Sequence, residues 1–206
     1  MPQKAHPGCT IFAKILLMSV RILIAFVTIL LFACNESAKP KAAARVNSTN
    51  TPAFDTAVGK ALARYYELTE KFVNWDSAGV NASAAQLHEQ LNAVPVSERK
   101  DSVASREFSK TVASLDSLLT AKTLAGKRGF LNTLTENYFS FLRASKYNVS
   151  EVYLNVCPMA FRNEDSAGVW LSDVDTISNP YYGVRHPYYK RGMAECGSNQ
   201  AKLGVN

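Results

Sequence analysis

The stretch TPAFDTAVGKALARYYELTEKF, residues 51–72, decides the fold class of this 206-residue chain. Its apolar residues recur at alternating steps of four and three, which is the spacing of one face of an amphipathic helix. Thr51 and Pro52 are typical of a helix start, because threonine caps a first turn and proline fits into it. The stretch therefore predicts a long helix with one buried face, formed by Phe54, Val58, Ala61, Tyr65, Leu68 and Phe72.

Outward from this stretch, a second helix is predicted after a glycine-containing break at residues 76–81. Ser83 to Gln86 resembles a capping box, in which the side chains of the first turn bond to its free backbone N–H groups. Leu87 and Leu91 then continue the apolar spacing toward Pro95. This pattern indicates a short helix that begins near Ser83.

Two further helices complete the helical part of the chain. A third is predicted from about Lys100 to Lys122, and Gly126 and Gly129 flank the turn into a fourth. Four antiparallel helices with short connections predict a mainly α fold, an antiparallel four-helix bundle over residues 54–150. The residues expected to face its core are Val103, Phe108, Val112, Leu115 and Leu119 in the third helix, and Phe130, Leu134, Tyr138, Phe141 and Leu142 in the fourth.

Residues 151–206 have a different pattern. Val152, Leu154 and Val156 alternate with other residues, which is the periodicity of a strand. Glycine and proline are frequent in the remainder of this segment and favour turns. We expect a small, turn-rich C-terminal segment with one or two short strands, packed on the bundle as part of the same domain.

The first 33 residues have the features of a lipoprotein signal peptide. Residues 22–33 read ILIAFVTILLFA and carry no charge, a length that suits a secretory leader and is too short to span a membrane. Leu31 to Cys34 resembles the lipobox of bacterial lipoproteins, where the leader is cleaved before a cysteine that carries lipid. We expect lipidation of Cys34, a flexible tether over residues 34–53, and a lipid-anchored, periplasmic or surface-exposed place in the cell envelope.

Several function classes lack support in the sequence. The formal net charge of +6 falls to +3 on removal of residues 1–33, because they carry three basic residues and no acid. With this small excess and no aromatic-basic signature, we expect no nucleic-acid partner. Beyond the leader only His88 and His186 are histidines, and neither a phosphate loop nor a G-x-S-x-G elbow is present. We therefore expect no enzymatic activity.

The sulfur atoms beyond Cys34 all lie in the C-terminal segment. They belong to Cys157, Met159, Met193 and Cys196. Cys157 and Met159 are two apart on an extended segment, and Met193 and Cys196 are three apart, so each pair can present both sulfurs on one side. Thiolates and thioethers are soft ligands that select Cu(I). The spacing predicts a Cu(I) site with these four ligands and with His186 as a candidate fifth donor.

A disulfide between Cys157 and Cys196 explains the same two cysteines. Outside the cytoplasm two cysteines in one domain commonly pair, and closing this loop would stabilise the fold by about 4 kcal/mol on the chain-entropy model. The methionines would then only pack nearby. The spacing leaves both interpretations open, and the second describes a disulfide-stapled, non-enzymatic interaction module that docks on a membrane partner.

A set of short motifs in the C-terminal segment resembles a family of bacterial lipoproteins, the domain of unknown function 3347. The motifs are Cys157 to Ala160 (CPMA), Trp170 to Ser172 (WLS), Ile177 to Gly183 (ISNPYYG) and Met193 to Gly197 (MAECG). Similar domains are also attached to the adaptor subunits of heavy-metal efflux pumps. The resemblance implies a role in heavy-metal handling or efflux, with copper as the metal and an efflux adaptor or another envelope protein as a partner. This chain departs from the pattern in a longer loop between Gly183 and Met193.

Overall fold

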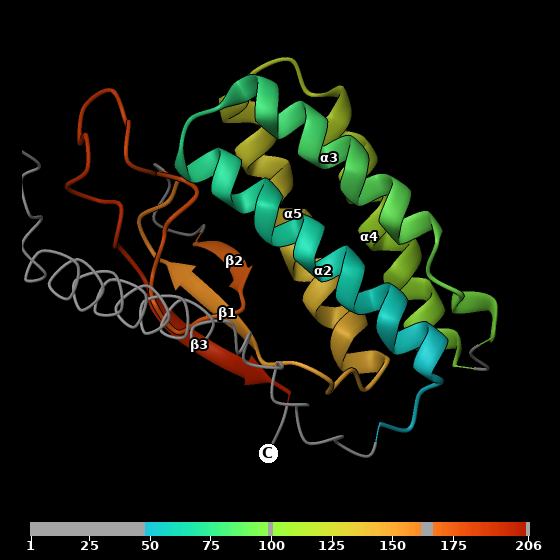
Figure 1. The fold of residues 1–206 in the computed structure, drawn as a ribbon. Helices are drawn as coiled ribbons and strands as arrows, with labels where there is room; N and C mark the ends of the chain where they lie inside the picture. The colour runs from blue at the N-terminus through green and yellow to red at the C-terminus, as the bar shows by residue number, and fades with distance from the viewer. Residues whose placement is uncertain (1–47, 99–100, 162–166, 205–206) are drawn as a thin grey trace, which may run out of the picture. The chain divides into compact units, whose positions relative to one another are not determined.

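The computed structural model describes residues 48–98, 101–161 and 167–204, so the predicted signal peptide, Cys34 and all but the last residues of the predicted tether lie outside the described residues. The described chain is mainly helical and carries one small antiparallel sheet, which confirms the predicted mainly α class (Figure 1). Its helices are α2 (Pro52–Val73), α3 (Ser77–Asn92), α4 (Ser102–Thr120) and α5 (Leu124–Ala144), with a short 3-10 helix at Val96–Glu98.

Each α-helix begins at a polar residue whose side chain accepts a hydrogen bond from a backbone N–H of the first turn. The four capping residues are Thr51, Asp76, Asp101 and Thr123. Such caps satisfy backbone donors that have no partner within the helix, and they explain where the helices start. Thr51 and Pro52 occupy the capping and first-turn positions that the sequence predicts for them.

Two predicted helix boundaries are wrong. Ser83 does not begin the second helix but lies inside α3, where it is buried, because the carboxylate of Asp76 caps the helix a full two turns earlier. Gly126 and Gly129 do not flank a turn, because Thr123 already caps α5 and both glycines lie within it. Glycine lowers helix propensity by only about 1 kcal/mol, which a cap and a packed helix face can offset.

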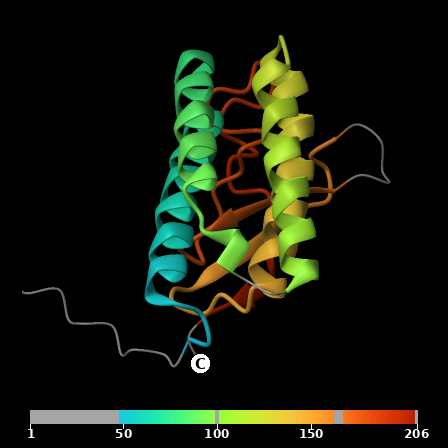
Figure 2. The same ribbon diagram turned by 90° about the vertical axis from the view of Figure 1, so that its right-hand side faces the viewer.

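The four helices share one hydrophobic core. α2 packs on α3, α3 contacts α4, and α4 packs on α5. Figure 2 shows the helices as two pairs, α2 with α3 and α4 with α5. The predicted core residues Leu134, Tyr138, Phe141 and Leu142 are buried, as are the six expected in α2. Val103 and Phe130 were expected in the core but are 45% and 40% exposed. Val103 is the second residue of α4, whereas Phe130 lies in the second turn of α5.

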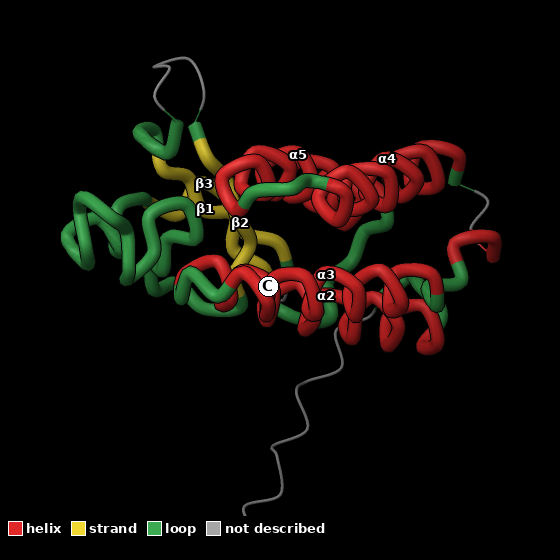
Figure 3. The backbone as a smooth tube through the Cα atoms, turned by 90° about the horizontal axis from the view of Figure 1, so that it is seen from above, coloured by secondary structure: helices red, strands yellow, loops and turns green. Residues whose placement is uncertain are grey.

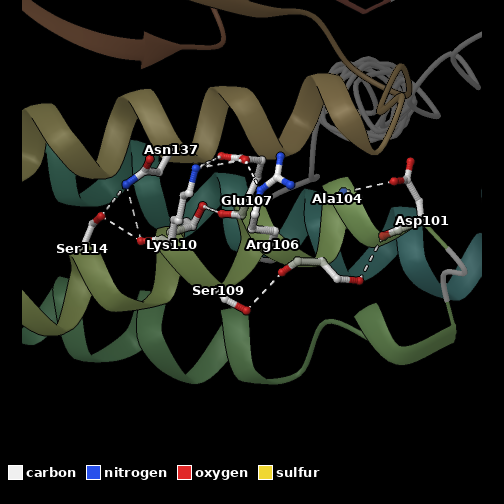
Figure 4. A network of polar contacts seen from close by, with 10 residues as sticks. Asp101, Ala104, Arg106, Glu107, Ser109, Lys110, Ser114 and Asn137 are labelled. Carbon is white, nitrogen blue, oxygen red and sulfur yellow. Dashed lines mark hydrogen bonds and ion pairs between the residues drawn. The ribbon is translucent and has the colours of Figure 1, made fainter.

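A polar cluster on α4 adds contacts beside the core (Figure 4). The Nδ2 group of Asn137, on α5, donates to Ser114 Oγ over 2.7 Å and so joins α5 to α4. Glu107 lies within 3.1 Å of both Arg106 and Lys110. These ion pairs involve exposed basic side chains, so each contributes little to stability.

The sheet contains β1 (Val152–Cys157), β2 (Gly168–Ser172) and β3 (Ser198–Leu203), in the order β2-β1-β3 with antiparallel pairing. β2 contacts α2 and α5, and Figure 3 shows the strands beside these helices. β1 confirms the predicted strand, but one or two strands were expected and the described residues contain three. β3 reads SNQAKL, whose mostly polar side chains show no strand alternation.

β1 is the central strand of the sheet, and residues on both of its faces are buried. Val152, Asn155 and Cys157 are buried, while Leu154 and Val156 are only partly covered. The register with β3 shifts between Leu154 and Asn155, which leaves Gln200 of β3 as the extra residue, while the pairing of β1 with β2 stays regular. Asn155 and Cys157 lie on the same face of β1 by ordinary strand alternation, which places Cys157 on the side of Trp170, the partner of Asn155 on β2.

Candidate functional site

The two cysteines of the C-terminal segment lie side by side. The Sγ atoms of Cys157 and Cys196 are 2.8 Å apart although the residues are 39 positions apart in the chain. Cys157 ends β1 and is fully buried, and Cys196 lies in the turn that leads into β3 and is partly buried. The pairing of Val156 with Ser198 brings the two residues together, because each cysteine lies next to this strand pair.

Asn179 holds the chain around the cysteine pair. Its buried Nδ2 donates to the carbonyl of Cys196 over 2.7 Å, and its Oδ1 accepts from the backbone N–H groups of Tyr181 and Tyr182 at 2.8 and 3.2 Å. The Asn179 backbone N–H also donates to Ala194. The asparagine of the ISNPYYG motif is thus a structural link between two loops that form the site.

Gly183 ends the same motif and fixes it against the helices. The residue has φ of +62°, and a Cβ there would lie 2.3 Å from the carbonyl oxygen of Val73. Only glycine accepts this conformation and this close approach without strain. The next residue, Val184, donates its N–H to that same oxygen over 2.9 Å. The C-terminal segment is therefore docked on the end of α2.

The surroundings of the cysteine pair are aromatic. Cys157 packs in a small buried cluster with Trp170 and Tyr181, and Tyr182 lies against it. Burial and the neighbouring Cys157 raise the pKa of the Cys196 thiol to about 11. Cys196 is therefore protonated at neutral pH and is a poor nucleophile, since the thiolate is the reactive form.

Next to the pair, a cavity of about 810 Å³ opens in the described surface. Three of the predicted metal ligands line it, namely Met159, His186 and Met193. Its walls are mostly aromatic, with contributions from Trp75, Tyr182, Tyr188 and Tyr189 among others. The five predicted ligands therefore divide into two groups, the thiols in the buried cluster and the remaining three along the cavity.

The expectation that Cys157 and Met159 face the same side is wrong. β1 ends at Cys157, so Met159 lies in the following turn and is 54% exposed, whereas Cys157 is fully buried. The hydroxyl of Tyr182 donates to the backbone carbonyl of Met159 and holds this turn against the cavity. Met193 is joined to the other cysteine by a bond from the Cys196 N–H to its carbonyl at 3.1 Å, as expected for a tight turn.

The hydrogen bonds of His186 leave neither ring nitrogen free to bind a metal, since Nδ1 accepts and Nε2 carries the proton. Its Nδ1 accepts from the backbone N–H groups of Tyr188 and Tyr189 at 3.2 and 3.3 Å. A ring nitrogen that accepts carries the lone pair, so the proton of the neutral ring lies on Nε2. Burial and the charge of Arg128 lower the pKa of His186, which keeps the ring neutral. A metal could bind Nε2 only after both Nδ1 contacts were lost.

Arg128 belongs to this site and was missed in the sequence. It lies on α5, is 7% exposed and lines the cavity. Its guanidinium carbon lies 4.1 Å from the centroid of the Trp75 ring, within cation–π distance. No local pattern marks it, because it is one of several basic residues in a helix and its burial depends on the C-terminal segment folding over it.

Chemically, the described residues offer two sites side by side. The paired thiols can form a disulfide or, once deprotonated, two thiolate ligands. Within residues 48–98, 101–161 and 167–204, no three side chains of His, Cys, Asp or Glu are grouped as a metal site. Comparisons with protein-family models, with curated proteins and with solved structures found no match. Among the described helices, none is long and apolar enough to cross a membrane.

Proposed function

We propose that this chain is an exported lipoprotein whose C-terminal segment binds Cu(I) through the thiolates of Cys157 and Cys196, in heavy-metal handling or efflux. The observation that carries the proposal is the 2.8 Å approach of two sulfur atoms from positions 39 residues apart. Thiolates are soft ligands that favour Cu(I) over harder ions. The methionines at positions 159 and 193 lie within three residues of a cysteine each and offer thioethers as further soft donors.

Binding of Cu(I) between the two thiols requires two changes at the site. A metal between the sulfurs requires them to move apart, and Cys196 can do so because it lies in a turn, whereas Cys157 is held at the end of β1. Both thiols must also lose their protons. Because the pKa of Cys196 is raised to about 11, Cu(I) affinity should increase with pH throughout the neutral range.

Cu(I) titration of the full chain in detergent, under reducing conditions, tests the proposal. We expect binding of about one Cu(I) per chain and its loss in the double variant Cys157→Ser with Cys196→Ser. The matched control is Met159→Leu with Met193→Leu, which keeps both thiols and should keep the bound ion at weaker affinity. Unchanged binding in the cysteine variant would show that the thiolates are not ligands.

The 2.8 Å distance favours a second candidate as well, the disulfide-stapled, non-enzymatic interaction module that docks on a membrane partner. Oxidation would close a long loop and stabilise the fold by about 4 kcal/mol. Counting free thiols in protein from the native envelope distinguishes the candidates. Two oxidised cysteines that resist mild reductant support the module, and two free thiols that Cu(I) protects from alkylation support the metal site.

Export and anchoring rest on the sequence at Leu31 to Cys34. The variant Cys34→Ser should be released from membranes or remain unprocessed, because the lipid is the predicted anchor. Fractionation and intact mass measure this. A variant with the same mass in the same membrane pool would argue against lipidation. The partner remains the one implied by the resemblance to the domain of unknown function 3347, an efflux adaptor or another envelope protein.

We also infer that the four helices form the antiparallel four-helix bundle predicted for residues 54–150. Support comes from the contacts of each helix with the next and from short connections, which favour antiparallel neighbours. The first and last helices are joined by the hydrogen bond between Tyr65 and Thr135, at 2.5 Å, which closes the ring of contacts.

A further inference from the structure

The cavity beside the cysteine pair contains a buried positive charge without an acidic partner in the described residues. Arg128 is 7% exposed, and none of the residues that line the cavity is an aspartate or glutamate. No carboxylate in the described chain forms an ion pair with it. Burying a cation is costly unless a counter-charge or several hydrogen bonds replace its water.

Two backbone carbonyls compensate this cost only in part. Arg128 Nε donates to the carbonyl of Pro180 over 2.9 Å and one Nη2 hydrogen to that of Phe72 over 3.2 Å. A guanidinium has five N–H donors. Nη1 therefore has no hydrogen-bond partner among the described residues, and Arg128 lines the cavity.

The guanidinium remains charged in this environment. Burial lowers the pKa of Arg128 to about 10, which is still well above neutral pH. One face of the group is covered by the Trp75 ring, 4.1 Å from its carbon atom, so its orientation is fixed. A fixed, planar cation with free N–H groups on one edge is the arrangement that binds a carboxylate with two parallel hydrogen bonds.

The remaining walls describe the body of the ligand. The rings of Tyr182, His186 and Tyr189 lie within 5.0–5.4 Å of one another and form a continuous aromatic surface. The Nε2 group of His186, which carries the proton of the neutral ring, is a further donor. Aromatic walls with a few polar groups are typical of cavities for small organic ligands, and about 810 Å³ is within their usual size.

From the unpaired guanidinium and the aromatic walls, we infer that this cavity binds a small organic carboxylate with a flat, apolar body. The carboxylate pairs with Arg128, and the body lies between the aromatic rings. This site goes beyond the proposed Cu(I) function, since it uses neither thiol. Met159 and Met193 line the same cavity, so a metal bound by the thiols and these thioethers would border the carboxylate site.

Benzoate is the probe for this inference, with benzamide as its neutral counterpart and acetate as its counterpart without a ring. The titration uses the metal-free full chain in detergent and follows its tryptophan fluorescence, to which Trp75 in the cavity wall and Trp170 both contribute. We expect benzoate to bind about tenfold more tightly than either control, because charge-assisted hydrogen bonds and ring stacking both contribute. Equal affinity for benzoate and benzamide would overturn the inference.

Two variants assign the contacts. Arg128→Gln should lower benzoate affinity about tenfold and leave benzamide affinity unchanged, whereas Arg143→Gln, at an exposed arginine of the same helix, should change neither. Tyr189→Ala, at a 53% exposed ring, should weaken benzoate and benzamide alike. If Arg128→Gln fails to fold, two measurements still test the inference. One compares benzoate with benzamide and acetate on the unaltered chain, and the other measures benzoate binding by Tyr189→Ala. Because no metal is present, failure here leaves the Cu(I) proposal intact.

Discussion

The helical region and the C-terminal segment are stabilised in opposite ways. In α2–α5 the backbone bonds join residues three or four apart, and one large cluster of side chains covers the inner faces. In the C-terminal segment the fixing bonds join distant residues, as between Val184 and Val73, and the buried cluster centres on Cys157, Trp170 and Tyr181. The first region depends on packing volume, whereas the second depends on individual polar contacts.

The largest expected effect on the free energy of unfolding tests the claim that the helical region depends on core packing. Phe141 is fully buried, and its ring contacts Phe54, Phe108 and Tyr138 at centroid distances of 5.1–6.3 Å. Phe141→Ala should lower the free energy of unfolding by about 3–5 kcal/mol, because it removes buried surface and leaves a cavity. Urea denaturation followed by circular dichroism measures this loss.

Phe130→Ala is the matched control on the same helix. Phe130 is 40% exposed, so its truncation should cost less than about 1 kcal/mol. Similar losses in the two variants would mean that Phe130 is part of the core after all, as its place in the apolar spacing of the sequence predicts.

Helix existence could be read from the sequence because it depends on local spacing. The apolar steps from Phe54 to Phe72 predict α2, and all six residues are buried. The helix starts were harder to predict, because several polar residues near a break can serve as the cap. Asp76 and Ser83 are both capping residues by type, and in the structure the cap is Asp76, whose side chain accepts from the Gly79 N–H.

The candidate site could be predicted from the sequence only for residues of an uncommon type that lie far apart in the chain, such as the cysteines. Sulfur marks Cys157 and Cys196 as a pair, and the structure brings them together. The end of β1 at Cys157 has no clear signal in the sequence, so Met159, which lies in the following turn, was wrongly predicted to continue the strand. Arg128 carries no signal either, since its burial results from contacts with residues more than 50 positions away.

A smaller loss of stability tests the claim that the C-terminal segment depends on individual polar contacts. Asn179→Ala removes three side-chain hydrogen bonds and leaves the Cys196 carbonyl and the Tyr181 N–H without these partners. We expect a loss of about 2–3 kcal/mol, because such groups are costly when buried and unpaired. The released turn should also expose Cys196, so iodoacetamide should alkylate reduced protein faster. Urea denaturation and mass spectrometry provide the two measurements.

Asn199→Ala is the corresponding control. The Nδ2 group of Asn199 donates to the carbonyl of Asp175 over 3.0 Å, but the contact is exposed and water can replace it. Its loss should change stability by about 0.5 kcal/mol or less. If Asn179→Ala leaves alkylation of Cys196 as slow as this control does, the asparagine does not hold the cysteine turn.

The smallest expected effect on stability concerns a helix cap in the helical region. Because a cap is a local contact, we expect its loss to have little influence on the C-terminal segment. Asp101 caps α4 by accepting from the N–H groups of Val103 and Ala104 at 2.8 and 3.3 Å. Figure 4 shows the bond to Ala104. Asp101→Ala should cost about 1 kcal/mol, the usual value of such a cap, by urea denaturation. Asp116→Ala, which removes only an exposed contact with His88 on α3, should lower the free energy of unfolding by about 0.3 kcal/mol. Because a local cap acts on its own helix, both variants should leave Cys196 alkylation unchanged. Faster alkylation in Asp101→Ala alone would show that the start of α4 is coupled to the cysteine site, and the separation of the two regions would then be wrong.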